Sequence, residues 1–131
     1  MKKGGILNPA ICSLLAELGH TDRLLIVDAA FPLPMDGPVI DLTLTQGIPR
    51  LLDVLRAVAD ELVIESIAVP VEIKDYSPRL FQEILKIVGD IDVDELPFHE
   101  FKEQALDCKG IIRTAEFSSY ANVRIVAGSA F

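Results

Sequence analysis

Apolar residues recur along the chain with two alternating spacings, one typical of helices and one typical of strands. The first helical spacing is carried by Ile11, Leu14, Leu15 and Leu18. This pattern predicts a helix with one buried face, preceded by Asn8 as N-cap and with Pro9 at its first position. Gly19 follows the pattern at once, so we expect it to end the helix in the left-handed conformation.

Two further helices are predicted by apolar stripes of the same spacing in the middle of the chain. The stripes consist of Leu51, Leu52, Val54, Leu55 and Val58, and of Phe81, Ile84, Leu85 and Val88. Pro49 opens the first of these helices, which we expect to run to Asp60, and Ser77 and Pro78 open the second. A fourth helix, short and polar, is predicted over residues 99–107.

Strands are predicted between these helices. The run RLLIV (23–27) is almost entirely apolar, which is typical of a strand covered on both faces. The other predicted strands are 39–44, 62–69, 110–114 and 122–128, and the Pro-rich segment 32–38 is expected to be a loop. Strands that alternate with helices over short connections predict a single α/β domain over residues 1–131, with a largely parallel sheet flanked by helices.

Composition and charge narrow the class of ligand. Half of the 131 residues are apolar, and the net charge is −8. Nucleic-acid binding needs a basic face, so a neutral ligand or another protein subunit is the better expectation. No apolar run approaches the ~18–20 residues of a membrane span, and the N-terminus lacks a signal-peptide pattern, which predicts a cytoplasmic protein without a membrane partner. Cys12 and Cys108 lack metal-type spacing, and we expect both to be reduced.

Several common catalytic sites lack their motifs in this chain. Neither glycine-rich phosphate loop, GxGxxG or GxxxxGK[ST], is present, and there is no G-x-S-x-G elbow. Catalytic zinc usually takes three protein ligands, whereas the only two histidines, His20 and His99, lie almost 80 positions apart. We therefore expect no metal and no cofactor, and proton transfer to a neutral ligand remains.

His20 and Asp28 flank the first predicted strand and are the first candidates for that chemistry. Histidine is the side chain that changes charge near neutral pH, which suits a general acid or base, and Asp22 and Asp28 are carboxylates near it in sequence. Asp28 follows the strand, and ligand sites of open α/β sheets gather beyond the carboxyl ends of strands. The alternative is that His20 bonds a carbonyl at the helix end, that Asp22 caps a turn and that Asp28 is a solvated loop residue.

A second polar cluster lies between the last two predicted strands and includes Arg113, Glu116, Tyr120 and Asn122. An aromatic face packs on the C–H surface of a sugar, and an amide pairs with vicinal hydroxyls, so Tyr120 and Asn122 suit a carbohydrate. The alternative is that Tyr120 fills the core and Asn122 shapes the turn. The last residue, Phe131, follows an apolar strand, and we expect it to be buried against another subunit.

Several segments of the chain carry a resemblance to a known family. They are GILNPAICSLLAELGHTD, DAAFPLP, IDLTLTQGIP, EIK and IIRTAEFSSYANVRIVAG, followed by the final Phe. The most specific are LGHTD near the start and YAN near the end. On these segments the chain resembles the D-ribose pyranase family, relatives of the L-fucose mutarotases, from its N-terminus to Phe131.

The resemblance implies a cofactor-free isomerase that interconverts the pyranose and furanose rings of D-ribose. It also implies a ring-shaped homo-oligomer, typically a decamer of two stacked pentamers, with sites near subunit boundaries. His20 would be the proton donor, and Asp28, Tyr120 and Asn122 would bind the sugar. His99, which precedes a Phe-Lys pair as a family histidine does, would bind it too.

The chain departs from the family pattern at a few positions. The family histidine stands two residues before the Phe-Lys pair, so that its position falls on Phe98 in strict register, and His99 is one residue late. DAAFP replaces the more usual DAGLP, RTAE replaces RTGE, and SSYAN lacks a proline before its tyrosine. Phe31, in DAAFP, is more typical of the fucose relatives, so one alternative is an L-fucose-type mutarotase. The other alternative is a non-catalytic sugar-binding subunit.

Overall fold

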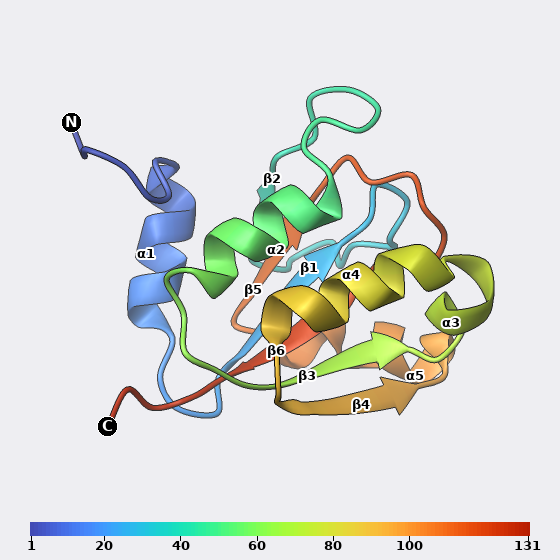
Figure 1. The fold of residues 1–131 in the computed structure, drawn as a ribbon. Helices are drawn as coiled ribbons and strands as arrows, with labels where there is room; N and C mark the ends of the chain where they lie inside the picture. The colour runs from blue at the N-terminus through green and yellow to red at the C-terminus, as the bar shows by residue number, and fades with distance from the viewer.

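One six-stranded sheet forms the centre of the computed structural model, which describes residues 1–131 (Figure 1). Its strands are β1 (Arg23–Val27), β2 (Val39–Asp41), β3 (Ile64–Pro70), β4 (Asp92–Leu96), β5 (Gly110–Arg113) and β6 (Val123–Ala127). They lie in the order β2-β5-β1-β6-β3-β4, and β6 alone runs antiparallel to its neighbours. The prediction of a largely parallel sheet flanked by helices is confirmed.

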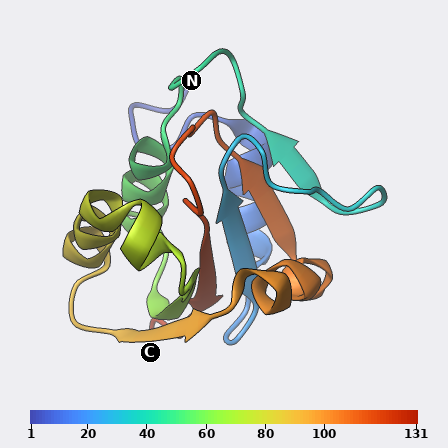
Figure 2. The ribbon, with the colours of Figure 1, turned by 90° about the vertical axis from the view of Figure 1, so that its right-hand side faces the viewer.

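Helices cover both faces of this sheet. They are α1 (Pro9–Glu17), α2 (Leu51–Ala59), α3 (Ile73–Tyr76), α4 (Pro78–Val88) and α5 (Phe98–Glu103), and a 3-10 turn, η1 (Gln104–Asp107), continues α5. The larger core lies between one face and the helices α1, α2 and α4, and the smaller core lies under α5 and η1 on the other face (Figure 2). None of these helices has both the length and the apolar character needed to cross a bilayer.

Strand β1 lies between β5 and β6 and contributes to both cores. Leu24 and Ile26 belong to the larger core, whereas Leu25 and Val27 belong to the smaller one. This division follows from the strand geometry, because successive side chains point to opposite faces. The continuous apolar run therefore reflects a strand covered on both faces, as predicted.

The end of α1 differs from the prediction. The helix ends at Glu17, and Leu18 is an extended C-cap with φ −70° and ψ 120°. Gly19 does not adopt the left-handed conformation, which Thr21 adopts instead with φ 74°. Thr21 is held there because its N–H donates to the carbonyl oxygen of Ala127 at 2.8 Å, which ties the turn to β6.

Side chains stabilise the starts of α1 and α2, whereas Ser77 makes no side-chain cap hydrogen bond at the start of α4. The Asn8 side chain caps α1 by accepting a hydrogen bond from the N–H of Ile11, as predicted. Arg50, and not Pro49, is the N-cap of α2, and its N–H donates to the carboxylate of Asp53 at 2.9 Å. The carboxylate lies in the first turn, where a negative charge stabilises a helix.

Two elements were not predicted, and one strand is shorter than expected. Helix α3 spans a single turn, and β4 has the sequence DVDEL, whose acidic residues disfavour a strand. Strand β2 ends at Asp41 rather than at residue 44, because the chain then turns back, with the N–H of Leu44 donating to the carbonyl oxygen of Ile48. The fourth predicted helix corresponds to α5 and η1.

Both cysteines are free, as predicted. Cys12 is half-buried, and its thiol donates to the carbonyl oxygen of Ile6 at 3.1 Å. Cys108 is buried beneath η1, and this burial raises the pKa of its thiol to about 11. A thiol held in that state is a poor nucleophile, so Cys108 acts as a packing residue.

Candidate functional site

The predicted site residues lie at two opposite edges of the sheet. The carboxyl edge is where the five parallel strands end, and it carries Asp28, Phe98 and, because β6 is antiparallel, Tyr120 and Asn122. The amino edge is where those strands begin, and it carries His20. The five residues of β1 separate the two edges by about 13 Å at the usual strand rise. One chain therefore does not bring His20 and Asp28 together.

Asp28 and Asn122 form a buried hydrogen-bonded pair at the carboxyl edge. The N–H of Asp28 donates to Oδ1 of Asn122 at 2.9 Å, and Nδ2 of Asn122 donates to Oδ2 of Asp28 at 3.4 Å. The other carboxylate oxygen of Asp28 accepts from the N–H of Ala30 at 3.0 Å. Asn122 is fully buried, so its amide serves to fix the Asp28 carboxylate.

The pKa of Asp28 lies above its ordinary value because burial penalises the charged carboxylate. Hydrogen bonds from the backbone of Ala30 and Phe31 and from the Asn122 side chain oppose this shift without cancelling it. No cation pairs with the carboxylate; the nearby guanidinium of Arg113 bonds Asp41 and the carbonyl oxygen of Ala29. A buried carboxylate kept without a counter-ion is typical of a functional site.

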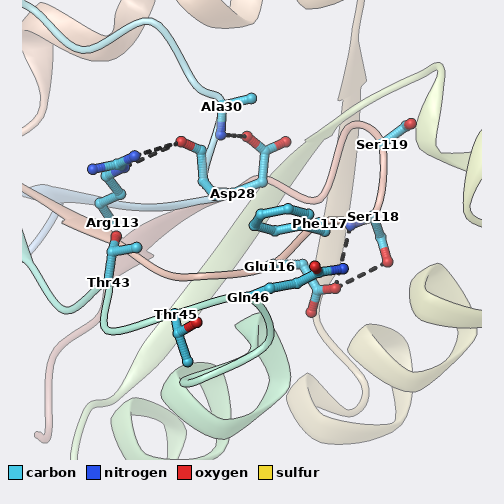
Figure 3. Close-up of a pocket in the computed structure, with 11 residues that line it drawn as sticks. Asp28, Ala30, Thr43, Thr45, Gln46, Arg113, Glu116, Phe117, Ser118 and Ser119 are labelled. Carbon is cyan, nitrogen blue, oxygen red and sulfur yellow. Dashed lines mark hydrogen bonds between the residues drawn. The ribbon is translucent and has the colours of Figure 1, made fainter.

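A cavity of about 490 Å³ opens beside Asp28 (Figure 3). Three loops line it: residues 28–30 after β1, residues 43–46 after β2 and residues 113–119 after β5. Figure 3 shows the ring of Phe117 lying between the Asp28 and Glu116 side chains. Tyr120 and Asn122 do not line this cavity, so Asp28 stands between the cavity on one side and these two residues on the other.

The charged groups around this cavity hold the loops in place. The buried carboxylate of Glu116 accepts from the N–H of Leu51, at the start of α2, at 3.1 Å, and from the hydroxyl of Ser118 at 2.9 Å. The other lining polar side chains include the hydroxyls and amide of Thr43, Thr45, Gln46 and Ser119. Neutral donors and acceptors of this kind suit a polyhydroxylated ligand.

Four aromatic side chains, named here the aromatic wall, gather at the carboxyl edge: Phe31, Tyr76, Phe98 and Tyr120. The ring of Tyr120 contacts Tyr76 at a centroid distance of 5.2 Å and Phe98 at 5.3 Å. Tyr120 has a left-handed backbone with φ 59°, which is uncommon for a residue with a bulky side chain. The fold therefore holds the tyrosine ring against Tyr76 and Phe98 through an unusual turn.

Phe98, and not His99, is the residue of its segment that joins the aromatic wall. The His99 side chain is 71% exposed, and its nearest acidic neighbour is Glu100 at 4.0 Å. The N–H of Phe98 donates to both carboxylate oxygens of Glu72, at 3.0 and 3.1 Å. The strict register of the sequence, which placed Phe98 at this position, thus agrees with the geometry, and a sugar contact by His99 stays a prediction.

At the amino edge, His20 is exposed and paired. Its Nε2 lies 2.9 Å from Oε1 of Glu65, and both side chains are about half exposed. The carboxylate of Asp22 accepts from the N–H of Gly19 at 2.7 Å and from Nζ of Lys109 at 3.0 Å. These bonds hold the pKa of Asp22 below its ordinary value, the Gly19 amide contributing most. Asp22 therefore fixes the turn that carries His20.

The chain has no cluster of side chains that could bind a metal ion. No three histidine, cysteine, aspartate or glutamate side chains converge. His20 and His99 lie at opposite edges of the sheet, since one precedes β1 and the other follows β4.

Sequence reasoning missed several residues that shape the carboxyl edge. The loop side chains Thr43, Thr45 and Gln46 lie in the segment IDLTLTQGIP, and their place at the end of a predicted strand was a usable signal for a site. Glu72 lies in a charged segment after β3, and its carboxylate anchors the backbone of Phe98. Tyr76 belonged to the same charged segment, and only the fold shows that it packs on Tyr120.

Comparison with known proteins gives full-length matches. A model of the RbsD / FucU transport protein family matches residues 1–130. The D-ribose pyranase of Geobacillus kaustophilus is 44% identical over 131 residues, which cover 100% of this chain and 96% of the relative. The D-ribose pyranase of Kosmotoga olearia is 42% identical over 132 residues, with 100% of both chains covered.

Two solved structures superimpose on all or nearly all of this chain. The structure of Bacillus subtilis RbsD complexed with D-ribose superimposes with a TM-score of 0.96 at 37% identity, with 100% of both chains covered. The fucose mutarotase of Streptococcus pneumoniae in complex with L-fucose gives a TM-score of 0.71 at 17% identity, covering 95% of each chain. At that identity the second match concerns the fold alone.

Proposed function

We propose that this chain, which belongs to the RbsD / FucU transport protein family, is a cofactor-independent sugar isomerase acting on D-ribose. It would interconvert the pyranose and furanose rings. The observation that carries the proposal is the buried Asp28 carboxylate, oriented by Asn122 and next to an aromatic wall and a cavity with neutral polar groups. The names of the full-length relatives agree with this activity.

The proposed reaction needs only proton transfers. Ring opening breaks the bond between the anomeric carbon and the ring oxygen; the ring oxygen gains a proton and the anomeric hydroxyl loses one. The resulting aldehyde closes through a different hydroxyl by the reverse transfers. A positioned acid or base contributes ~10²–10⁴-fold to such a step, which suffices because the sugar already equilibrates slowly in water.

The proposed roles combine the chemistry of the side chains with what the family resemblance implies. His20 donates the proton to the ring oxygen, Asp28 accepts hydrogen bonds from sugar hydroxyls, and Tyr120 packs or hydrogen-bonds beside them. Asn122 supports Asp28 through its two hydrogen bonds. His99 is a binding residue only if a neighbouring chain or the bound sugar draws its exposed side chain inward.

A complete site then requires a second copy of the chain. His20 and Asp28 lie at opposite edges, so His20 of one copy must meet Asp28 of the next. Such a contact joins two different surfaces, and repeated contacts of this kind form a ring when the rotation between copies closes. A ring agrees with the decamer of two pentamers that the resemblance implies, and we propose this assembly, in the cytoplasm.

The test of the activity is exchange NMR on the ribose anomers. Saturation transfer between the pyranose and furanose signals should increase with added protein and be unaffected by a chelator. Exchange at the spontaneous rate despite sugar binding would instead indicate a non-catalytic sugar-binding subunit. Faster anomer exchange without faster change of ring size, or a preference for L-fucose, would indicate a mutarotase.

The shared site has a test of its own, based on mixing variants. His20→Ala and Asp28→Asn chains, each impaired alone, are refolded together, and exchange at subsaturating ribose is measured against each variant alone. If each site combines His20 from one copy with Asp28 from the next, about a quarter of the sites in a random ring regain both groups. No recovery would mean that the two residues do not act across a subunit boundary.

A further inference from the structure

The aromatic wall contains one residue that limits what the proposed site can recognise. Phe98 opens α5 directly after the edge strand β4, at the carboxyl edge. Its ring meets Tyr120 edge-on, with centroids 5.3 Å apart and planes at 78°, and meets Phe31 at 5.9 Å and 88°. Phe98 thus links the half-buried Tyr120 to the buried Phe31.

The position of Phe98 is fixed from two sides. Both carboxylate oxygens of Glu72 accept its N–H, so the start of α5 is anchored to the segment after β3. Behind it, Phe31 also contacts Phe101 edge-on, at 6.4 Å, and these two rings are 5% and 2% exposed. A ring packed in this way has little room to turn aside for a ligand.

The wall therefore offers no hydrogen bond at Phe98, next to the ring of Tyr120. A phenyl ring has neither donor nor acceptor, and the adjacent His99 is exposed to solvent. Sites that hydrogen-bond a hydroxyl reject analogues lacking it strongly, because a polar group is then left unpaired. An apolar surface leaves no such group unpaired and discriminates weakly.

We infer that Phe98 makes the chain tolerant of deoxypentoses: a pentose that lacks one ring hydroxyl is accepted nearly as well as D-ribose. This rests on the proposed function, since it names the substrate class of the same site. Glu72 is a positioning residue for this selectivity, because it holds Phe98 through the backbone.

The experiment compares D-ribose with 2-deoxy-D-ribose and 3-deoxy-D-ribose, both of which form pyranose and furanose rings. For each sugar the protein-dependent exchange rate is divided by its spontaneous rate, and dissociation constants are measured by NMR titration. The wild-type chain should keep at least one deoxy sugar within about threefold of D-ribose in both measurements.

Two variants of Phe98 make the test specific. Phe98→His introduces a hydrogen-bonding group of similar size and should favour D-ribose over that deoxy sugar by about tenfold more than the wild type. Phe98→Leu keeps the surface apolar and should retain the wild-type ratio. Circular dichroism and size-exclusion chromatography of each variant establish that it is folded and assembled.

The outcomes separate this inference from the proposed function. Tenfold or greater rejection of both deoxy sugars by the wild type, or equal ratios in the wild type and Phe98→His, would overturn the inference even if ribose exchange is catalysed. Binding without catalysis would overturn the proposed activity and leave the affinity ratios to decide the role of Phe98. Absence of sugar binding would overturn both.

Discussion

The two ends of β1 hold their polar groups in different ways. At the carboxyl edge, Asp28 and Asn122 are buried, bonded to each other and without a cation. At the amino edge, His20 and Glu65 form an ion pair that is about half exposed. A buried carboxylate carries a desolvation cost that an exposed pair avoids. The polar groups of the carboxyl edge are therefore organised within one chain, whereas the amino edge gains its role in the proposed function only if another copy covers it.

The largest effect is expected from His20→Ala. Loss of the proton donor should lower the protein-dependent exchange of ribose by ~10²–10⁴-fold. The melting temperature should change little, because the side chain is exposed and its ion pair is weak. Exchange NMR and differential scanning calorimetry on the same sample separate the two quantities, and wild-type exchange in this variant would remove His20 from the mechanism.

Asp28→Asn tests the other end of β1. A hydrogen bond to a charged group is worth ~1.5–3 kcal/mol, so ribose affinity measured by NMR titration should fall by about ten- to a hundredfold. The stability of this variant relative to the wild type should rise with pH, because only the wild type carries the desolvation cost that raises the pKa of Asp28. Unchanged affinity would contradict the role of Asp28.

The pH dependence of that stability difference has a defined sign. Because the folded pKa of Asp28 is raised, its contribution to stability is fully present below the unfolded value of 3.8 and is lost as the pH rises through the folded pKa. The stability of Asp28→Asn relative to the wild type should therefore increase as the pH rises from 3.8 through the folded pKa, and should not change with the titration of Asp28 below pH 3.8. Thermal melts of both proteins across this range measure it.

Asn122→Ala should destabilise the chain by ~1–3 kcal/mol, because the N–H of Asp28 loses its acceptor in a buried position. Denaturant unfolding measures the loss, and His20→Ala, at the exposed end, is the matched control. Equal stability of the two variants would mean that the carboxyl edge is not more tightly organised than the amino edge.

The smallest effect is expected from Glu65→Gln. An exposed ion pair is worth roughly 0.2–1 kcal/mol, so exchange should change by less than about fivefold, with no loss of folding. Asp22→Asn is a useful companion, since Asp22 holds the same turn through Gly19 and Lys109. A hundredfold loss in Glu65→Gln would show that the pair is part of the chemistry rather than a support.

Much of the fold could be predicted because the main helices and strands carry regular apolar spacing. Helices α1, α2 and α4 each present one apolar stripe, and β1 is a continuous apolar run. Strand β4 could not be predicted, because its acidic residues are unfavourable in strands and pairing with β3 outweighs that preference. The prediction for the end of α1 was wrong, because a hydrogen bond to β6 places the left-handed conformation at Thr21 rather than at Gly19.

The site was predictable by residue type and less so by arrangement. Asp28 and Asn122 stand 94 positions apart, and only the register between β1 and β6 brings them together. The separation of His20 from Asp28 could have been inferred, because the strand between them has a known length. The choice between Phe98 and His99 could be made only from the structure, because the orientation of these adjacent side chains in a short helix decides which one contacts Tyr120.

The acidic sequence of β4 also constrains how copies of the chain associate. An edge strand exposes unpaired backbone groups that invite another strand, and charged side chains oppose such pairing. Asp92, Asp94 and Glu95 place three negative charges along this edge, while β2 at the opposite edge offers only three residues. Sideways growth of the sheet into fibres is thus disfavoured at both margins, which agrees with the proposed association through the ends of the strands.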